Sequence, residues 1–131
     1  MRKAQTPAEF MILVGVMLFF FITFIYSLQI NNADKIRQQR DIIIKDAAFT
    51  VQDEINLALE ATDGYERTFT LTRYILGKDY DIDIIEGVVY AETDDGKHAI
   101  ALPVADVVVV NELQTGDNVI RKTDGVIYLN P

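Results

Sequence analysis

Few side chains in this 131-residue chain are of the types that carry out chemistry. Cysteine is absent, which excludes disulfides, thiolate metal sites and cysteine nucleophiles. Ser27 is the only serine and lies inside an apolar run, so it cannot join a Ser-His-Asp triad. His98 is the only histidine, so one chain cannot build a histidine-rich zinc site. Carboxylate and threonine chemistry remain, and the counts argue against an enzyme, a bound cofactor and a metal centre.

The strongest carboxylate pattern is the alternation of Asp79, Asp81 and Asp83, which has the opening spacing of a calcium-binding loop. Such a loop needs glycine where Ile84 stands and glutamate where Tyr90 stands, so the pattern indicates a solvated acidic strand face. His98 falls on the apolar side of its predicted strand, which favours a core histidine over a ligand.

Hydrophobic residues make up 50% of the chain and charged residues 24%, and the two kinds are segregated along the sequence. No charge interrupts the nineteen residues from Phe10 to Leu28. The formal net charge is −8, so the phosphates of a nucleic acid would repel the chain, and we expect no nucleic-acid partner.

The apolar run has the length of a membrane-spanning helix, and we place the span at residues 10–30. Arg2 and Lys3 precede it, which predicts a cytoplasmic N-terminus and an external remainder. The alternative, a secretory signal peptide, has a shorter apolar region and a small-residue cleavage site, and residues 26–29 offer no such site.

Glu9 lies at the edge of this run, where a carboxylate is costly and is by default a functional candidate. A structural explanation exists beside the functional one. Thr6, Pro7 and Glu9 form a capping box, with Thr6 as N-cap, Pro7 at the first helical position and Glu9 three residues after the cap. Both roles can belong to one residue.

The N-terminal segment, with Arg2-Lys3-Ala4, then Gln5, Glu9 and Leu13 before the apolar run, resembles the class III signal sequence of archaeal type IV pilin-like proteins. The resemblance implies that a prepilin peptidase cleaves between Ala4 and Gln5. Glu9 stands where that family carries its characteristic glutamate, and Leu13 matches its leucine. Pro7 replaces the usual serine, and Ala4 replaces the frequent glycine, which is tolerated.

The resemblance covers about thirty residues and implies a pilin, a structural subunit that polymerises through its apolar helix into a type IV pilus-like filament for adhesion. It implies as partners other copies of the chain, the prepilin peptidase, an assembly ATPase with its membrane platform, and the membrane before assembly. It also implies that Glu9 pairs with the new Gln5 amine of a neighbour. Two alternatives stay open: a single-pass membrane-anchored extracellular binding module, and an archaellum-type filament subunit.

These assembly residues require a long helix, which we expect over residues 5–62 after removal of leader residues 1–4. Apolar residues recur at helical spacing in its second half and predict a stripe that packs on the chain's own domain. The stripe consists of Ile36, Ile43, Ala47, Val51, Ile55 and Ala58, flanked by Ile44, Ala48 and Leu59. Asp63-Gly64 supplies the stop, with Gly64 placed for a left-handed C-terminal cap.

Residues 63–131 change to a period of two, which predicts a small antiparallel β domain and hence an α+β fold. The expected strands surround Phe69–Leu71, Tyr80–Ile84, His98–Leu102, Val107–Val110, Val119–Ile120 and Val126–Leu129. The β-branched run from Val107 to Val110 is typical of a buried strand. Because so few residues cannot enclose a large core, we expect the stripe at residues 43–59 to complete it.

Overall fold

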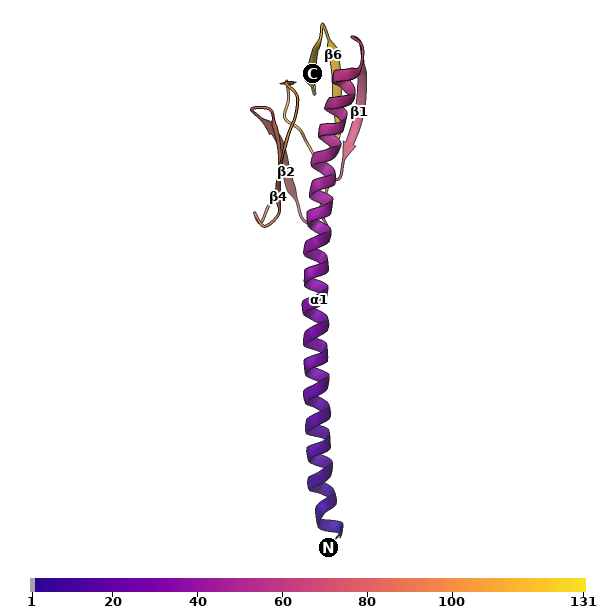
Figure 1. Ribbon diagram of the computed structural model, residues 1–131, viewed down its shortest axis with the longest axis vertical. Helices are drawn as coiled ribbons and strands as arrows, with labels where there is room; N and C mark the ends of the chain where they lie inside the picture. The colour runs from indigo at the N-terminus through magenta and orange to yellow at the C-terminus, as the bar shows by residue number, and fades with distance from the viewer. Residues whose placement is uncertain (1) are drawn as a thin grey trace. The chain divides into compact units, whose positions relative to one another are not determined.

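The computed structural model describes the backbone of residues 2–131 and the side chains of residues 6–131. The predicted cleavage site, Ala4–Gln5, lies outside the residues whose side chains are described. The chain divides into two compact units, one that ends at Gln38 and a second, Gln39–Pro131. One helix, α1 (Arg2–Glu60), enters both units, and seven strands belong to the second (Figure 1). The expected α+β class, a long N-terminal helix followed by a small β domain, is confirmed.

Two boundaries of α1 differ from the expectation. The helix already includes Arg2 to Gln5, so Thr6 lies within it and is not its N-cap in the uncleaved chain. Pro7 lacks an amide hydrogen, but this removes only one hydrogen bond so near the helix start, which explains why the helix extends past it. At the other end the helix stops at Glu60, two residues early.

The end of α1 is capped by a distant side chain rather than by Gly64. The Lys122 ammonium donates hydrogen bonds to the carbonyls of Leu59 and Ala61, each at 2.8 Å. Gly64 has the positive φ expected of it, +91°, but its amide donates to the Lys122 carbonyl. A cation at these carbonyls also complements the negative end of the helix dipole.

The strands form two sheets. The four-stranded sheet has the order β1-β6-β7-β5, with β1 (Glu66–Leu71), β6 (Gly116–Thr123), β7 (Val126–Leu129) and β5 (Val108–Val109). The three-stranded sheet is the meander β2 (Tyr80–Ile85), β3 (Val88–Thr93) and β4 (Ala99–Pro103). All pairs are antiparallel except β5–β7, which is parallel.

The last turns of α1 lie with β2 and β4 on one side and β1 and β6 on the other (Figure 1). Six helix side chains enter the core that the two sheets share: Ile44, Ala47, Ala48, Val51, Ile55 and Ala58. The prediction that the helix completes the core of the β domain is confirmed. Ile36, which was assigned to this stripe, is 43% exposed, and Leu59, which was placed beside it, is 52% exposed, so the expectation that they pack on the domain was wrong.

The expectation for Val107–Val110 was also wrong. Only Val108 and Val109 form a strand, and this strand is the edge of its sheet. Val108 and Val110 are 44% and 51% exposed, because an edge strand on a small domain has one uncovered face. Six or seven strands were expected, and the seventh, β3, lies where no strand had been placed.

Candidate functional site

The residues expected to act in assembly lie in the first unit, on exposed positions of α1. Thr6, Pro7 and Glu9 are exposed, and Leu13 is 56% exposed. The Glu9 carboxylate has no ion-pair partner among residues 6–131. The side chain of Gln5, its expected partner on a neighbouring copy, is outside the described residues. The roles of these residues stay predictions.

The apolar run itself has no cover within the described chain. Its large side chains are between 41% and 72% exposed from Phe10 to Leu28. By length and composition this part of α1 is able to span a membrane. The helix is uninterrupted here, as expected from the lack of proline between Pro7 and Pro103.

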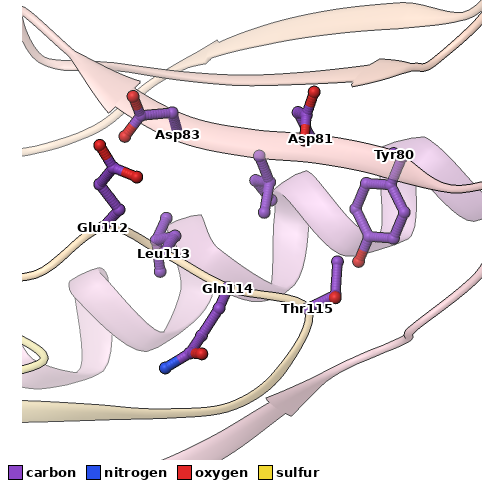
Figure 2. Close-up of a pocket in the computed structure, with 8 residues that line it drawn as sticks. Tyr80, Asp81, Asp83, Glu112, Leu113, Gln114 and Thr115 are labelled. Atoms are coloured by element: carbon purple, nitrogen blue, oxygen red, sulfur yellow. The ribbon is translucent and has the colours of Figure 1, made fainter.

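The second unit contains a pocket of about 420 Å³ between β2 and the segment that precedes β6. Tyr80 and Asp83 come from β2, and Glu112 and Thr115 come from the facing segment (Figure 2). The figure shows the Asp83 and Glu112 carboxylates at one end and Tyr80 near Thr115 at the other. Among residues 6–131, no three His, Asp or Glu side chains are arranged to hold a metal ion.

Tyr80 lines this pocket and is itself buried. Its side chain is 3% exposed, and its hydroxyl donates a 2.6 Å hydrogen bond to the Thr72 carbonyl. Burial raises the pKa of the Tyr80 hydroxyl to about 12, because an apolar environment disfavours the phenolate. Tyr80 therefore stays protonated at neutral pH and acts as a structural hydrogen-bond donor.

The acidic strand face is more varied than its pattern indicates. Asp79 and Asp81 are exposed, but Asp83 is half-buried and accepts a 2.7 Å hydrogen bond from the Ile84 amide. Beside this strand, Asp95 lies in the β3–β4 turn, where Lys78 contacts it. The bond to Lys78, then those to the Thr93 hydroxyl and the Lys97 amide, hold the pKa of Asp95 well below its usual range.

His98 lies in the core, as the sequence predicts, with 6% of its surface exposed. Its Nδ1 is 2.5 Å from Oδ1 of Asp41 on α1, so the ring connects the helix to the start of β4. A second buried polar group, Glu54, was missed: it is 7% exposed on the core side of α1, and its Oε2 lies 3.6 Å from Nε of Arg67. The sequence signal for its burial was its helical spacing from Val51, Ile55 and Ala58, which lie on the same face of α1.

Comparisons with protein-family models, with characterised proteins and with solved structures return no match for this chain. The functional argument therefore depends on the residues and on their arrangement.

Proposed function

We propose that this chain is a pilin, the structural subunit of an extracellular type IV pilus-like filament that serves adhesion. The observation that carries the proposal is the uncovered apolar run at residues 10–28 of a helix whose later turns are the core of a folded domain. The order of residues before that run, from Arg2 to Leu13, supports the same class of protein.

The apolar run cannot stay in water. Fifteen large apolar side chains between residues 10 and 28 are more than 40% exposed. If covering each contributes about 1 kcal/mol, their exposure costs on the order of 15 kcal/mol. Lipid or the same segment of other copies must cover them. The proposal uses both: lipid before assembly, and other copies in the filament.

A filament follows if the contact between copies joins two different surfaces. Such a contact does not close on itself and generates a helical polymer. Within the bundle, Glu9 would be the one charge that each helix brings next to the apolar run. Cleavage between Ala4 and Gln5 creates an amine that can neutralise this carboxylate on a neighbour.

A second candidate is a membrane-anchored extracellular binding module, which the pocket between Tyr80 and Glu112 favours. In that case lipid covers the apolar run permanently, and the chain remains in the membrane fraction.

The decisive experiment examines filaments sheared from cells that produce the chain. Antibodies raised against the second unit should label them in electron micrographs, and mass spectrometry should find Gln5 as the first residue of the labelled subunit. A chain that keeps Met1 and sediments only with membranes would refute the proposal and favour the anchored module.

The role of Glu9 is tested by comparing Glu9→Gln with Thr6→Ala. If Glu9 neutralises the amine of a neighbour, Glu9→Gln leaves an unpaired charge in an apolar bundle, at a cost of several kcal/mol per contact. Filaments should then disappear, while cleavage and membrane insertion persist. Thr6→Ala keeps the charge and should still assemble. Normal filaments from Glu9→Gln would reduce Glu9 to a helix-capping residue.

A further inference from the structure

One wall of the pocket in the second unit is the outer edge of a β-sheet. Strand β2 is the outer strand of its sheet, and in the described part of the chain it pairs with β3 alone. Consecutive residues 80–83 of β2 and 112–115 of the facing segment line a space of about 420 Å³ between them. The two segments run side by side in opposite directions (Figure 2). We call this space the edge groove.

The register of the β2–β3 hairpin shows which backbone groups of β2 point toward the edge groove. Opposite residues of an antiparallel pair alternate between exchanging two hydrogen bonds and exchanging none. The Asp94 amide donates to the Asp79 carbonyl at 3.1 Å, so the odd-numbered residues of β2 bond to β3. The backbone groups of Tyr80 and Ile82 therefore point the other way, toward the groove.

The N–H and C=O groups of Tyr80 and Ile82 have no hydrogen-bond partner within residues 6–131. The next amide along this edge, that of Ile84, donates to the Asp83 carboxylate at 2.7 Å, which agrees with the deduced direction. Tyr80 and Ile82 are only 3% and 5% exposed. Buried backbone groups are almost always paired, and unpaired ones are costly, so these groups indicate a place for a further strand.

The opposite wall presents its backbone in the same way. The Glu112 carbonyl accepts a 3.1 Å hydrogen bond from the Asn130 side chain. The Gln114 amide and carbonyl bond to the Asn118 side chain, at 3.1 and 2.7 Å. Leu113, which lies between them, has no backbone hydrogen bond within residues 6–131. These residues form neither helix nor turn, and successive backbone groups of an extended chain alternate in direction, so those of Leu113 face β2.

The edge groove is also acidic. Asp81, Asp83 and Glu112 line it, and no basic residue does. None of these three carboxylates forms an ion pair within residues 6–131. Figure 2 shows the carboxylates of Asp83 and Glu112 at the same end of the groove. A lysine or arginine side chain at this end would form charge-assisted hydrogen bonds with them.

We propose that the edge groove binds an extended peptide segment of another protein, with a lysine or arginine side chain at the Asp83–Glu112 end. The segment adds to β2 as a further strand and bonds to the backbone of Tyr80 and Ile82. In this mode of recognition, backbone hydrogen bonds supply affinity and side-chain contacts supply specificity. The inference goes beyond the filament, because an anchored binding module can use the same groove.

Hydrogen exchange measures the addition of a strand directly. The probe is a blocked six-residue peptide in which lysine alternates with valine, added to the full chain in detergent. With peptide bound, NMR should show the amides of Tyr80 and Ile82 exchanging about tenfold more slowly or less, because they gain acceptors. The amides of Asp81 and Asp83 already bond to β3 and should change little. Binding without this protection would refute the proposal, and so would a dissociation constant above about 1 mM.

Two altered probes separate strand addition from charge attraction alone. Methylation of alternate backbone amides keeps every lysine of the peptide but removes donors that the groove carbonyls need, so binding should weaken about tenfold or more. Replacement of lysine by glutamate should abolish binding, because the groove is acidic. Undiminished binding of the methylated peptide would refute the added strand, and undiminished binding of the glutamate peptide would refute the charged contact.

The charged end of the groove is tested by Glu112→Gln, which changes an exposed side chain and should weaken binding of the lysine peptide about tenfold. The matched control is Glu60→Gln, which removes the same charge at an exposed position outside the groove and should leave binding unchanged. Equal weakening by both variants would refute the assigned contact. An unmodified chain that forms filaments but does not bind the peptide would refute this inference alone and leave the proposed function intact.

Discussion

The contact of Lys122 with the end of α1 gives a stability prediction that the structure allows to be quantified. Lys122 is half-buried, and its ammonium donates to two helix carbonyls, those of Leu59 and Ala61. Lys122→Met keeps much of the aliphatic stem but removes both hydrogen bonds. A hydrogen bond from a charged group contributes about 1.5–3 kcal/mol when well shielded. Because the site is half-exposed, water replaces part of these two hydrogen bonds. We therefore expect Lys122→Met to lower the free energy of unfolding by about 2 kcal/mol in total.

For a unit of this size, a loss of about 2 kcal/mol lowers the midpoint of thermal unfolding by roughly 10 °C. Near-ultraviolet circular dichroism of the detergent-solubilised chain follows the second unit selectively. The chain has no tryptophan, and five of its six tyrosines lie after Gln39.

The matched control is Lys97→Met, which removes an exposed lysine whose ammonium forms no ion pair with residues 6–131 and should change stability by less than about 0.5 kcal/mol. Lys122→Arg keeps a cationic donor and should recover at least half of the loss. If Lys122→Met unfolds at the same temperature as Lys97→Met, the capping argument is refuted.

Three further predictions concern the same unit. Ile55→Ala should destabilise it by about 2–5 kcal/mol in denaturant unfolding, whereas Leu59→Ala, four residues on and 52% exposed, should cost less than about 1 kcal/mol. The raised pKa of Tyr80 stabilises the fold fully below pH 10, and this stabilisation, about 3 kcal/mol, should be lost as the pH rises from 10 to about 12. Tyr80→Phe should abolish that part of the alkaline transition, and an unchanged transition would contradict the assignment. The lowered pKa of Asp95 stabilises the fold above pH 4, so stability should fall below that pH, and Asp95→Asn should weaken this acid dependence as measured by unfolding at pH 2–5.

The helix stripe could be predicted because it depends on a local periodicity. Burial of Ala47, Val51 and Ile55 follows from their spacing alone, and the structure confirms it. The errors are Ile36 at the start of the stripe and Leu59, which was expected to flank its end. Periodicity gives the direction of a side chain, but the extent of the β domain decides which side chains it covers.

The strands were harder to predict from the sequence than the helix. β3 is joined to β2 by a two-residue turn in which Glu86 and Gly87 both have positive φ, 50° and 77°. This geometry is usual for Asn-Gly or Asp-Gly, so Glu-Gly is a weak sequence signal. The corresponding turn before β7 contains Asp124-Gly125, a common sequence for such a turn, with φ values of 52° and 77°. The same backbone geometry was thus predictable only where its sequence was the common one.

Polar contacts between distant segments could not be predicted. The Asp41–His98 and Glu54–Arg67 pairs and the Lys122 cap each join α1 to a segment far along the chain. The pattern of residues in a single sequence does not indicate which distant side chains will pair. Glu54 shows the consequence. Its helical position predicts burial and its charge predicts exposure, and its ion-pair partner, Arg67, lies far along the chain at 3.6 Å from the Glu54 Oε2 atom.

The division of α1 also bears on how a filament would form. The second unit has its own core, to which six side chains of the helix contribute, and none of those six precedes Ile44. Under the proposed function, moving a subunit from membrane to filament therefore changes the surroundings of residues 10–28 without any change in the folded unit. The free energy of assembly then depends on the difference between lipid and protein around one apolar helix segment, a difference that dispersion and close packing must supply because both environments are equally apolar. A specific charged contact such as the one proposed for Glu9 would consequently contribute to the register between copies rather than to the bulk of their affinity.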